Sequence, residues 1–428
     1  MVSSAFAHPF RALSLSVKRA PLAVREQLAL DEAACRQLLR TLRHELGLTD
    51  LLVLSTCQRT EVYYAGAQDC SGEILLALGH LKQCPIGPDW QPYFEVLTEA
   101  EAVVQHLFDV ALGLEARVLG DWQVISQVKQ AYQWSAALGM AGPFLHRLLH
   151  AVFAAHKRVQ TETRFRDGAA SASYATLELV QELTAHLACP RVLVVGVGAI
   201  GADVCRHLAA RKASFGDVAL CNRTRQKAAE LAAQTGLRLA EFDDLPAALR
   251  EADIVISAIR CPQAFFTRAL VARASGAAGQ VFVDLSVPRS VAPDVAQVSG
   301  VQLYNIDAIR SKTSAALAQR QAAVPQVRAL ITESLAQLHT WSHARRISPL
   351  IKQLKNKLEH LRQRELDRYG KRLSPAEAAL LEATTRSLMQ QVLKQQVLHL
   401  KAACQCPNGE PLVAQLSEFF AFDYQAVA

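Results

Sequence analysis

Cys57 is surrounded in the sequence by residues with hydroxyl, guanidinium and carboxylate side chains, a combination suited to acyl chemistry. Residues 55–61 read Ser-Thr-Cys-Gln-Arg-Thr-Glu. A thiolate attacks ester carbonyls readily, and a nearby cation such as Arg59 favours the thiolate over the thiol. We therefore predict that Cys57 is a nucleophile. The alternative is a buried structural cysteine beside a solvent-facing Arg-Thr-Glu turn, because free cysteine is often simply buried.

An apolar run predicts the element that positions this cysteine. Residues 51–54 read Leu-Leu-Val-Leu, which is typical of a short buried strand. Such a strand would hold Cys57 rigidly at its end with the sulfur facing a cleft.

A glycine-rich turn forms a second chemical motif. It follows a strand pattern at residues 191–195 and opens a helix that extends to about Arg211. Glycines at this spacing allow a tight turn and close approach of a pyrophosphate, whose phosphates lie at the helix N-terminus. The predicted cofactor-binding residues of the turn are Gly196, Val197, Gly198, Ala199, Ile200 and Gly201.

The strand order around this turn predicts the fold. Further strands are expected at residues 218–221, 254–258 and 281–285, alternating with helical segments. Alternation of strand and helix indicates a doubly wound, Rossmann-like parallel sheet.

The end of the second strand of this unit indicates which nicotinamide cofactor is bound. Asn222, Arg223 and Thr224 follow it, and no acidic residue is there to repel a 2′-phosphate. A guanidinium pairs well with a phosphate, and a threonine hydroxyl can add a donor. We therefore predict that these three residues select NADPH; an ordinary solvated turn is the alternative.

Composition limits the class of protein. The chain has 428 residues, enough for two or three domains, and no apolar run approaches the ~18 residues needed to cross a bilayer. There is no signal-peptide pattern, so we expect a cytoplasmic protein without membrane contact. The ten cysteines are scattered, with no Cys-x-x-Cys pair or histidine cluster. We expect reduced thiols and no metal site.

Positive charge is concentrated near the C-terminus. The net charge is +7, and residues 343–372 hold ten Lys or Arg against three Asp or Glu. Such an excess suits a polyanion such as tRNA. The alternative is the solvated face of a long helix.

Two blocks of the chain resemble the glutamyl-tRNA reductase family, which catalyses the first committed step of C5-pathway tetrapyrrole synthesis. Residues 54–63 match the family pattern Leu-Ser-Thr-Cys-Asn-Arg-Thr-Glu-x-Tyr, except that Gln58 replaces Asn. Residues 106–129 resemble the second block, with His106 at the position of a histidine proposed to assist catalysis. Taken alone, a histidine on an apolar helical face is more often structural.

The resemblance implies a two-step reaction. Cys57 would attack the ester that joins glutamate to tRNA, and hydride from NADPH would reduce the thioester to glutamate-1-semialdehyde. Arg59 would hold the substrate carboxylate, and Glu61 or Asp121 would face its ammonium group. The predicted substrate-binding residues are Thr56, Gln58, Arg59, Glu61, Asp121, Trp122, Gln123 and Gln127.

Departures from the family pattern leave other functions open. The family's histidine, serine and Glu-Pro pair are replaced by Val17, Ala116 and Asp121-Trp122. These changes would suit a non-catalytic paralogue that binds tRNA or pathway enzymes. A third possibility is a different thiol-dependent, aldehyde-forming dehydrogenase, which would not need a basic helical domain.

The resemblance also implies a three-domain α/β architecture. We expect an N-terminal α+β catalytic domain at residues 1–163, an NADP-binding domain at 164–305, and a long helix with a helical dimerisation domain at 306–428. Pro325 is expected to kink or split the long helix. Residues 374–377 predict a capping box that opens a further helix. The expected partners are glutamyl-tRNA, a second copy in a homodimer and, from the family only, glutamate-1-semialdehyde aminomutase.

Overall fold

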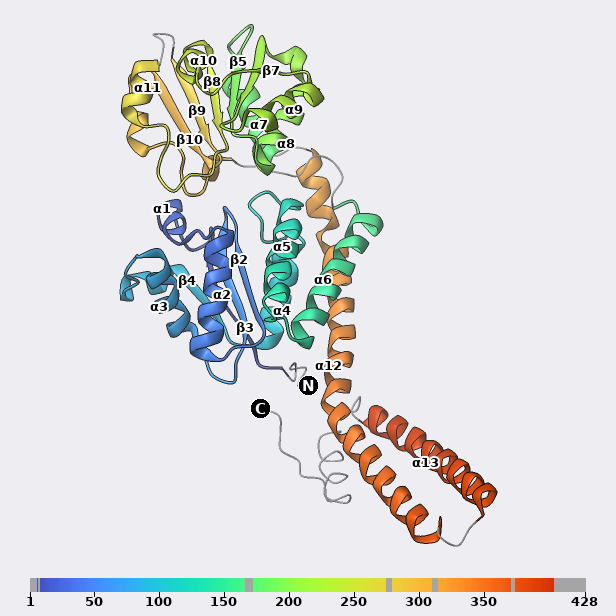
Figure 1. Cartoon of the computed structure of the whole chain (residues 1–428). Coiled ribbons are helices and arrows are strands. Elements are labelled where there is room, and N and C mark those ends of the chain that lie inside the picture. Colours follow the sequence, from blue (N-terminus) through green and yellow to red (C-terminus); the bar gives the residue numbers. More distant parts are fainter. Residues whose placement is uncertain are drawn as a thin grey trace. The chain divides into compact units, whose positions relative to one another are not determined.

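A computed structural model gives the fold (Figure 1). It describes residues 6, 8–165, 172–274, 279–309, 315–370 and 374–403. The chain divides into two compact units. The larger unit comprises Phe10–Thr98 and Ala102–Ile331, and the smaller comprises Met1–Pro9, Glu99–Glu101 and Thr332–Ala428.

The N-terminal part of the larger unit is built on a four-stranded antiparallel sheet with the order β2-β3-β1-β4. Its strands are β1 (Phe10–Ser16), β2 (Leu51–Ser55), β3 (Arg59–Ala65) and β4 (Phe94–Leu97). The predicted strand at 51–54 is therefore present. The solvent-facing turn considered for residues 59–61 is wrong, because these residues begin the buried strand β3.

Helices pack around this sheet (Figure 1). The apolar side chains of α2 and α3 share one buried cluster with Leu13, Val53 and Val62 of the sheet. The helix α2 begins at an aspartate cap, because the Asp31 carboxylate accepts from the Ala34 N–H. The helices of this part are α1 (Leu22–Arg25), η1 (Glu26–Leu28), α2 (Glu32–Leu46), α3 (Ser71–Lys82), η2 (Pro88–Tyr93), α4 (Ala100–Ala111), α5 (Gln123–Ala137) and α6 (Pro143–Glu162).

The second part of the larger unit is a six-stranded parallel sheet with the order β10-β9-β8-β5-β6-β7. Counted along the chain, this is the doubly wound order 3-2-1-4-5-6 in reverse, so the predicted Rossmann-like sheet is confirmed. Its strands are β5 (Arg191–Val195), β6 (Asp217–Cys221), β7 (Arg238–Leu239), β8 (Ile254–Ser257), β9 (Gln280–Asp284) and β10 (Val301–Asn305). Its helices are α7 (Ala172–Leu183), α8 (Ala199–Ala210), η3 (Lys212–Ser214), α9 (Arg225–Thr235), α10 (Leu245–Glu251), α11 (Arg268–Ala274), η4 (Pro293–Gln297) and η5 (Ile306–Ala308).

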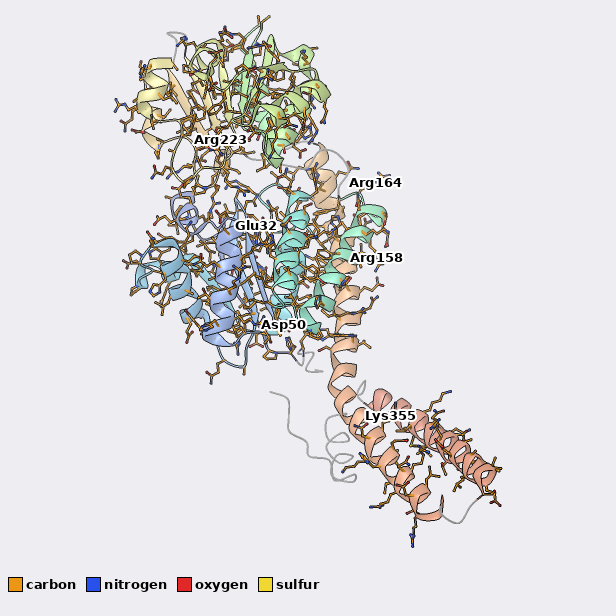
Figure 2. The ribbon with its side chains drawn as sticks, viewed as in Figure 1. Glu32, Asp50, Arg158, Arg164, Arg223 and Lys355 are labelled. Carbon is orange, nitrogen blue, oxygen red and sulfur yellow. The ribbon has the colours of Figure 1, made fainter. Side chains whose placement is uncertain are left out.

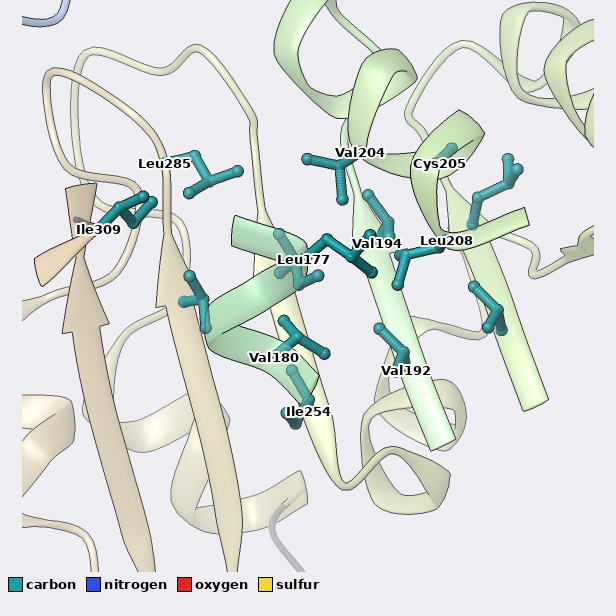
Figure 3. Packing of buried hydrophobic residues seen from close by; sticks show 14 of the residues in the cluster. Leu177, Val180, Val192, Val194, Val204, Cys205, Leu208, Ile254, Leu285 and Ile309 are labelled. Atoms are coloured by element: carbon teal, nitrogen blue, oxygen red, sulfur yellow. The ribbon is translucent and has the colours of Figure 1, made fainter. Parts of the chain in front are cut away.

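An apolar core holds the glycine turn in place (Figure 3). Leu177 and Val180 of α7, with Leu208 of α8, pack against Val192 and Val194 of β5. Burying each such side chain contributes about 1.5–3 kcal/mol. The helix α8 and the strand β5 are thereby fixed on either side of the turn.

Glycine is required at two positions of that turn. Gly196 has a φ of +97°, a conformation that other residues avoid. A Cβ placed on Gly201 would lie 2.0 Å from the Gly196 carbonyl oxygen. The close packing of the helix against the turn therefore depends on both glycines.

The long helix α12 spans Ala315–Gly370 as one element of 56 residues, so Pro325 does not split it, and the expected kink stays a prediction. Proline in a helix costs about 3 kcal/mol. The apolar side chains around it are buried: Val327 and Ile331 fully, Ala323 and Leu330 nearly so. At about 1.5–3 kcal/mol for each larger side chain, their burial outweighs the lost hydrogen bond.

The last described helix is α13 (Pro375–Ala403). Its predicted capping box is confirmed: the Ser374 N–H donates to Glu377 Oε2 (2.8 Å), and the Glu377 N–H donates to Ser374 Oγ (3.4 Å). Within the described ranges, no helix is both long and apolar enough to span a membrane.

Candidate functional site

Cys57 lies at the tip of the tight turn that joins β2 to β3. The Thr56 N–H donates to the Arg59 carbonyl oxygen (2.8 Å). The Thr56 hydroxyl oxygen accepts from the backbone N–H groups of Gln58 (3.1 Å) and Arg59 (3.2 Å). These bonds close the turn around a single side chain and fix the position of the sulfur.

Hydrogen bonds from residues outside the turn also hold it in place. The buried Gln58 accepts from the Arg117 N–H through Oε1 (2.9 Å), and its carbonyl accepts from the Val17 N–H (2.9 Å). The Arg25 guanidinium donates to the Cys57 carbonyl oxygen. Gln58 therefore has a structural task in the turn, while its role toward substrate stays a prediction.

The Arg59 side chain points into the protein, where it is 4% exposed. Nη1 donates to Glu61 Oε1 (2.9 Å), and Nη2 donates to the Glu115 carbonyl oxygen (2.7 Å). A guanidinium engaged in this way is paired with a buried carboxylate rather than with the thiol.

The fully buried Glu61 carboxylate gathers four partners. Oε1 also accepts from the Ser14 hydroxyl (2.7 Å) and contacts His106 Nε2 (3.0 Å), and Oε2 accepts from the Tyr63 hydroxyl (2.6 Å). Burial alone would raise the Glu61 pKa, but Arg59 and His106 outweigh it and hold that pKa well below its usual range. Glu61 is therefore an ionised internal anchor.

His106 responds to this carboxylate. Burial would lower its pKa, but the hydrogen bond to Glu61 and the charge of that carboxylate outweigh burial, so the His106 pKa is raised. The imidazolium form is favoured at a pH where a free histidine is mostly neutral.

The thiol of Cys57 is not activated in this structure. Burial is the main cause that raises its pKa to about 12; the Asp121 charge adds to the rise, and the Arg25 charge opposes it. The prediction that Arg59 promotes the thiolate is wrong, because its charge is taken up by Glu61. Deprotonation has to accompany attack.

Among the candidate carboxylates, Asp121 has the largest effect on the Cys57 pKa. It is buried, and its Oδ1 accepts from the Gln123 N–H (3.0 Å). Gln123 Nε2 donates to Ser173 Oγ (3.3 Å) and to Asp203 Oδ2 (3.2 Å). Trp122, by contrast, exposes 43% of its surface.

The structure gives the other predicted substrate residues no common contact. Gln127 is partly buried on α5. The roles of Thr56, Trp122, Gln123 and Gln127 toward a substrate stay predictions.

The backbone of the glycine turn is open at Gly198. A Cβ added to Gly198, the residue before α8, would meet nothing within 4 Å. The open backbone therefore suits close approach of a pyrophosphate to the helix N-terminus, where Val197, Ala199 and Ile200 supply the neighbouring backbone.

The ends of β5 and β6 are tied together beside this turn. The Val197 N–H donates to Asn222 Oδ1 (3.3 Å), and Asn222 Nδ2 donates to the Thr224 carbonyl oxygen (3.0 Å). Arg223 is exposed, whereas Arg225 is paired with Glu241 (3.0 Å). Figure 2 marks Arg223. Of these two arginines, only Arg223 has no carboxylate partner among the described residues, so its guanidinium could meet a phosphate of a bound dinucleotide.

Sequence reasoning missed the residues that join Cys57 to the nucleotide-binding part. Arg25, which bonds the Cys57 carbonyl, also donates to the Asp307 carboxylate (2.6 Å). Its neighbour Glu26 accepts from Arg289 Nε (2.8 Å). The Arg-Glu pair was visible in the sequence, but partners more than 250 residues away were not.

Apolar packing makes the same connection. Cys57 packs against the apolar cluster of the parallel sheet, and Leu22 and Val118 belong to that cluster. The thiol therefore lies beside the part of the unit that would hold a dinucleotide.

Cysteine and metal-ligand chemistry elsewhere is limited. The eight cysteines among the described residues are free thiols. Over the same residues, no group of three or more His, Cys, Asp or Glu side chains is placed to hold a metal ion.

Comparisons with known proteins cover nearly the whole chain. Residues 13–163 match the family model described as the glutamyl-tRNA(Glu) reductase N-terminal domain, and residues 326–422 match its dimerisation domain. Residues 178–312 match the shikimate/quinate 5-dehydrogenase model.

Individual relatives give the same picture. The glutamyl-tRNA reductase of Cytophaga hutchinsonii is 43% identical over 416 residues, covering 97% of this chain and 98% of the relative. That of Christiangramia forsetii is 31% identical and covers 92% of each chain. The solved glutamyl-tRNA reductase of Methanopyrus kandleri is 28% identical, covers 94% of this chain and 98% of its own, and has a TM-score of 0.48.

The raised pKa of Cys57 predicts a pH profile for alkylation. Because the thiolate fraction of a group with a pKa of about 12 grows about tenfold per pH unit, iodoacetamide labelling of Cys57 should accelerate from pH 7 to 10 without levelling off. Mass spectrometry of the Cys57 peptide measures the rate, with the exposed Cys189 as internal reference for the reagent. A plateau near pH 7 or 8 would show an activated thiolate instead.

Proposed function

Because the chain belongs to the glutamyl-tRNA reductase family, we propose that Cys57 carries the glutamyl group during the reduction of glutamyl-tRNA, the first step of C5-pathway tetrapyrrole synthesis. The observation that supports this role best is the placement of Cys57 at the tip of a closed turn, against the apolar cluster of the nucleotide-binding sheet. Neither the non-catalytic paralogue nor an unrelated dehydrogenase is favoured by relatives that match the chain from end to end.

In the first step, the Cys57 thiol releases its proton to solvent as the sulfur attacks the carbonyl carbon of the ester between glutamate and the terminal ribose of tRNA. A carbon–sulfur bond forms, the ester carbon–oxygen bond breaks, and the ribose oxygen leaves with a proton from a general acid, which solvent then reprotonates. A thioester accepts a hydride more readily than an ester does, so this step prepares the reduction. The turn that fixes the sulfur lets attack proceed without reordering the chain.

His106 is proposed to supply that proton. As an imidazolium held by Glu61, it can act as a general acid toward the departing ribose oxygen. Glu61 then stabilises the charge and fixes the ring, and it does not contact the substrate itself.

Asp121 is proposed to face the substrate ammonium, because the Glu61 carboxylate already has four partners. An ammonium near Asp121 would also neutralise the charge that raises the Cys57 pKa. Substrate binding would thus favour the thiolate. Arg59 stays the proposed partner of the substrate carboxylate, which would replace its bond to the Glu115 carbonyl.

The cofactor is proposed to be NADPH, held by residues 196–201 and 222–224. When bound, it supplies the hydride that converts the thioester to the aldehyde. The carbon–sulfur bond breaks, and the Cys57 sulfur takes up a proton again. Arg223 would pair with the 2′-phosphate, and the N-terminus of α8 would receive the pyrophosphate.

The proposed assembly is a homodimer formed through the C-terminal helices, whose residues match the dimerisation-domain model. Among the described side chains, Leu361 of α12 and Leu380, Leu388 and Val392 of α13 are exposed apolar groups that a second copy could cover. The basic residues between 343 and 372 are proposed to meet tRNA. We also propose glutamate-1-semialdehyde aminomutase as a partner and the cytoplasm as the location.

Trapping the thioester tests the proposed function. With glutamyl-tRNA labelled in glutamate and no NADPH, label should remain on the protein and be released by hydroxylamine. Adding NADPH should convert it to the semialdehyde. Cys57→Ser should abolish labelling, and Cys84→Ser, at another partly buried cysteine, is the matched control. Equal labelling of the Cys57→Ser variant would end the nucleophile assignment.

Cofactor choice is tested at Arg223. NADPH should be preferred over NADH by at least about tenfold in kcat/KM, equivalent to about 1.4 kcal/mol. Arg223→Ala should weaken NADPH far more than NADH, because only NADPH carries the 2′-phosphate. Arg225→Ala is the control, since that arginine is engaged by Glu241. Equal loss of both cofactors in Arg223→Ala would overturn the assignment.

A further inference from the structure

Carboxylates are nearly absent from the segment that runs from α5 through α6, where only the last residue, Glu162, is acidic. Residues 122–161 contain four Lys or Arg, three His and no Asp or Glu. Charged residues of one sign on a surface attract a polyanion and speed its encounter with the protein. The helices α5 and α6 therefore carry an excess of positive charge.

Three basic residues of α6 share one exposed face. Arg147, His150 and Lys157 are exposed, and their spacings of three and seven residues correspond to one and two turns of the helix. Arg164, two residues beyond the end of α6, is also exposed. We call these four residues the basic stripe. At 1.5 Å per residue, the helical part of the stripe, from Arg147 to Lys157, extends about 15 Å.

Acidic residues do not neutralise the stripe. The one carboxylate of α6, Glu162, is paired with Arg158 Nε (2.9 Å), which is a partly exposed neighbour. Among the described residues, no salt bridge engages Arg147, Lys157 or Arg164. Their charges are therefore available for a ligand.

The stripe leads toward Cys57. Figure 2 shows Arg158 and Arg164 toward the end of α6 that is remote from Asp50. Just beyond Arg164, the Phe165 carbonyl lies 3.1 Å from where a Cβ on Gly120 would be. Gly120 belongs to the loop of residues 113–121, whose Arg117 N–H bonds Gln58, the neighbour of Cys57.

From this arrangement we propose that the basic stripe binds the phosphate backbone of the tRNA near its aminoacylated end. The inference rests on the proposed function and adds residues other than those of the basic C-terminal segment. A backbone that follows α6 toward Arg164 arrives at the 113–121 loop, so its terminal ester is delivered to the turn that carries Cys57. Contacts to phosphates carry no sequence information, so the stripe supplies affinity and alignment rather than selection among tRNAs.

Charge neutralisation tests the stripe. The variant Arg147→Gln/Lys157→Gln/Arg164→Gln should bind uncharged tRNA at least tenfold more weakly than the parent in fluorescence anisotropy. The slope of log affinity against log salt concentration should fall by about 2–3, because three phosphate contacts are lost. With glutamyl-tRNA, KM should rise by a similar factor while kcat at saturation stays within about twofold.

A matched variant controls for net charge. Arg40→Gln/Arg250→Gln/Arg273→Gln removes the same charge from exposed positions on α2, α10 and α11. It should bind tRNA within about twofold of the parent. If the two triple variants bind tRNA equally, or if the stripe variant keeps the parent's salt slope, the proposal is wrong. A parent that binds tRNA through the stripe but forms no thioester would contradict the proposed function and leave the stripe supported.

Discussion

The buried carboxylate of Glu61 is the interaction on which the catalytic part depends most. An ion without solvent carries a large free-energy cost unless charges and hydrogen bonds compensate it. Here Arg59, His106, Ser14 and Tyr63 provide that compensation from β1, β3 and α4. Removing one partner of such a buried pair typically costs about 3–5 kcal/mol. The sheet and the helix that carries His106 are therefore locked together behind the Cys57 turn.

The same part of the structure explains why the Cys57 thiol has low reactivity before a substrate binds. Burial and the Asp121 charge keep Cys57 protonated, so the free enzyme presents a thiol of low reactivity to other electrophiles. In the proposed reaction, the ammonium of the substrate cancels one of these causes. Arg25 connects the turn to Asp307, next to the parallel sheet, so the sulfur is fixed with respect to both halves of the site.

Local features were the ones that could be predicted from the sequence. The strand at 191–195, the glycine turn and the capping box at Ser374 each depend on neighbours within a few residues. The burial of Arg59 and Glu61 could not be predicted, because charged residues are usually exposed. Here their burial depends on Ser14 and His106, which are distant in the sequence. The same limit applies to the Cys57 pKa. The sequence places Arg59 close to Cys57, but it does not show that the Arg59 guanidinium pairs with the Glu61 carboxylate instead of the thiol. The continuity of α12 through Pro325 could not be predicted for a related reason, because the burial of the side chains that stabilise the helix is a tertiary property.

The central claim is that Glu61 holds His106 as an imidazolium rather than binding substrate. The direct measurement is the His106 pKa from the 15N chemical shifts of its ring, assigned by comparison with His106→Gln. In the parent the pKa should lie above 6.5, so His106 stabilises the fold below the pKa of the unfolded chain, and that stabilisation is lost as pH rises through the folded pKa. Glu61→Gln should lower the His106 pKa. Asp109→Asn, a change on the same helix as His106, should leave that pKa unchanged. An unchanged pKa in Glu61→Gln would contradict the account.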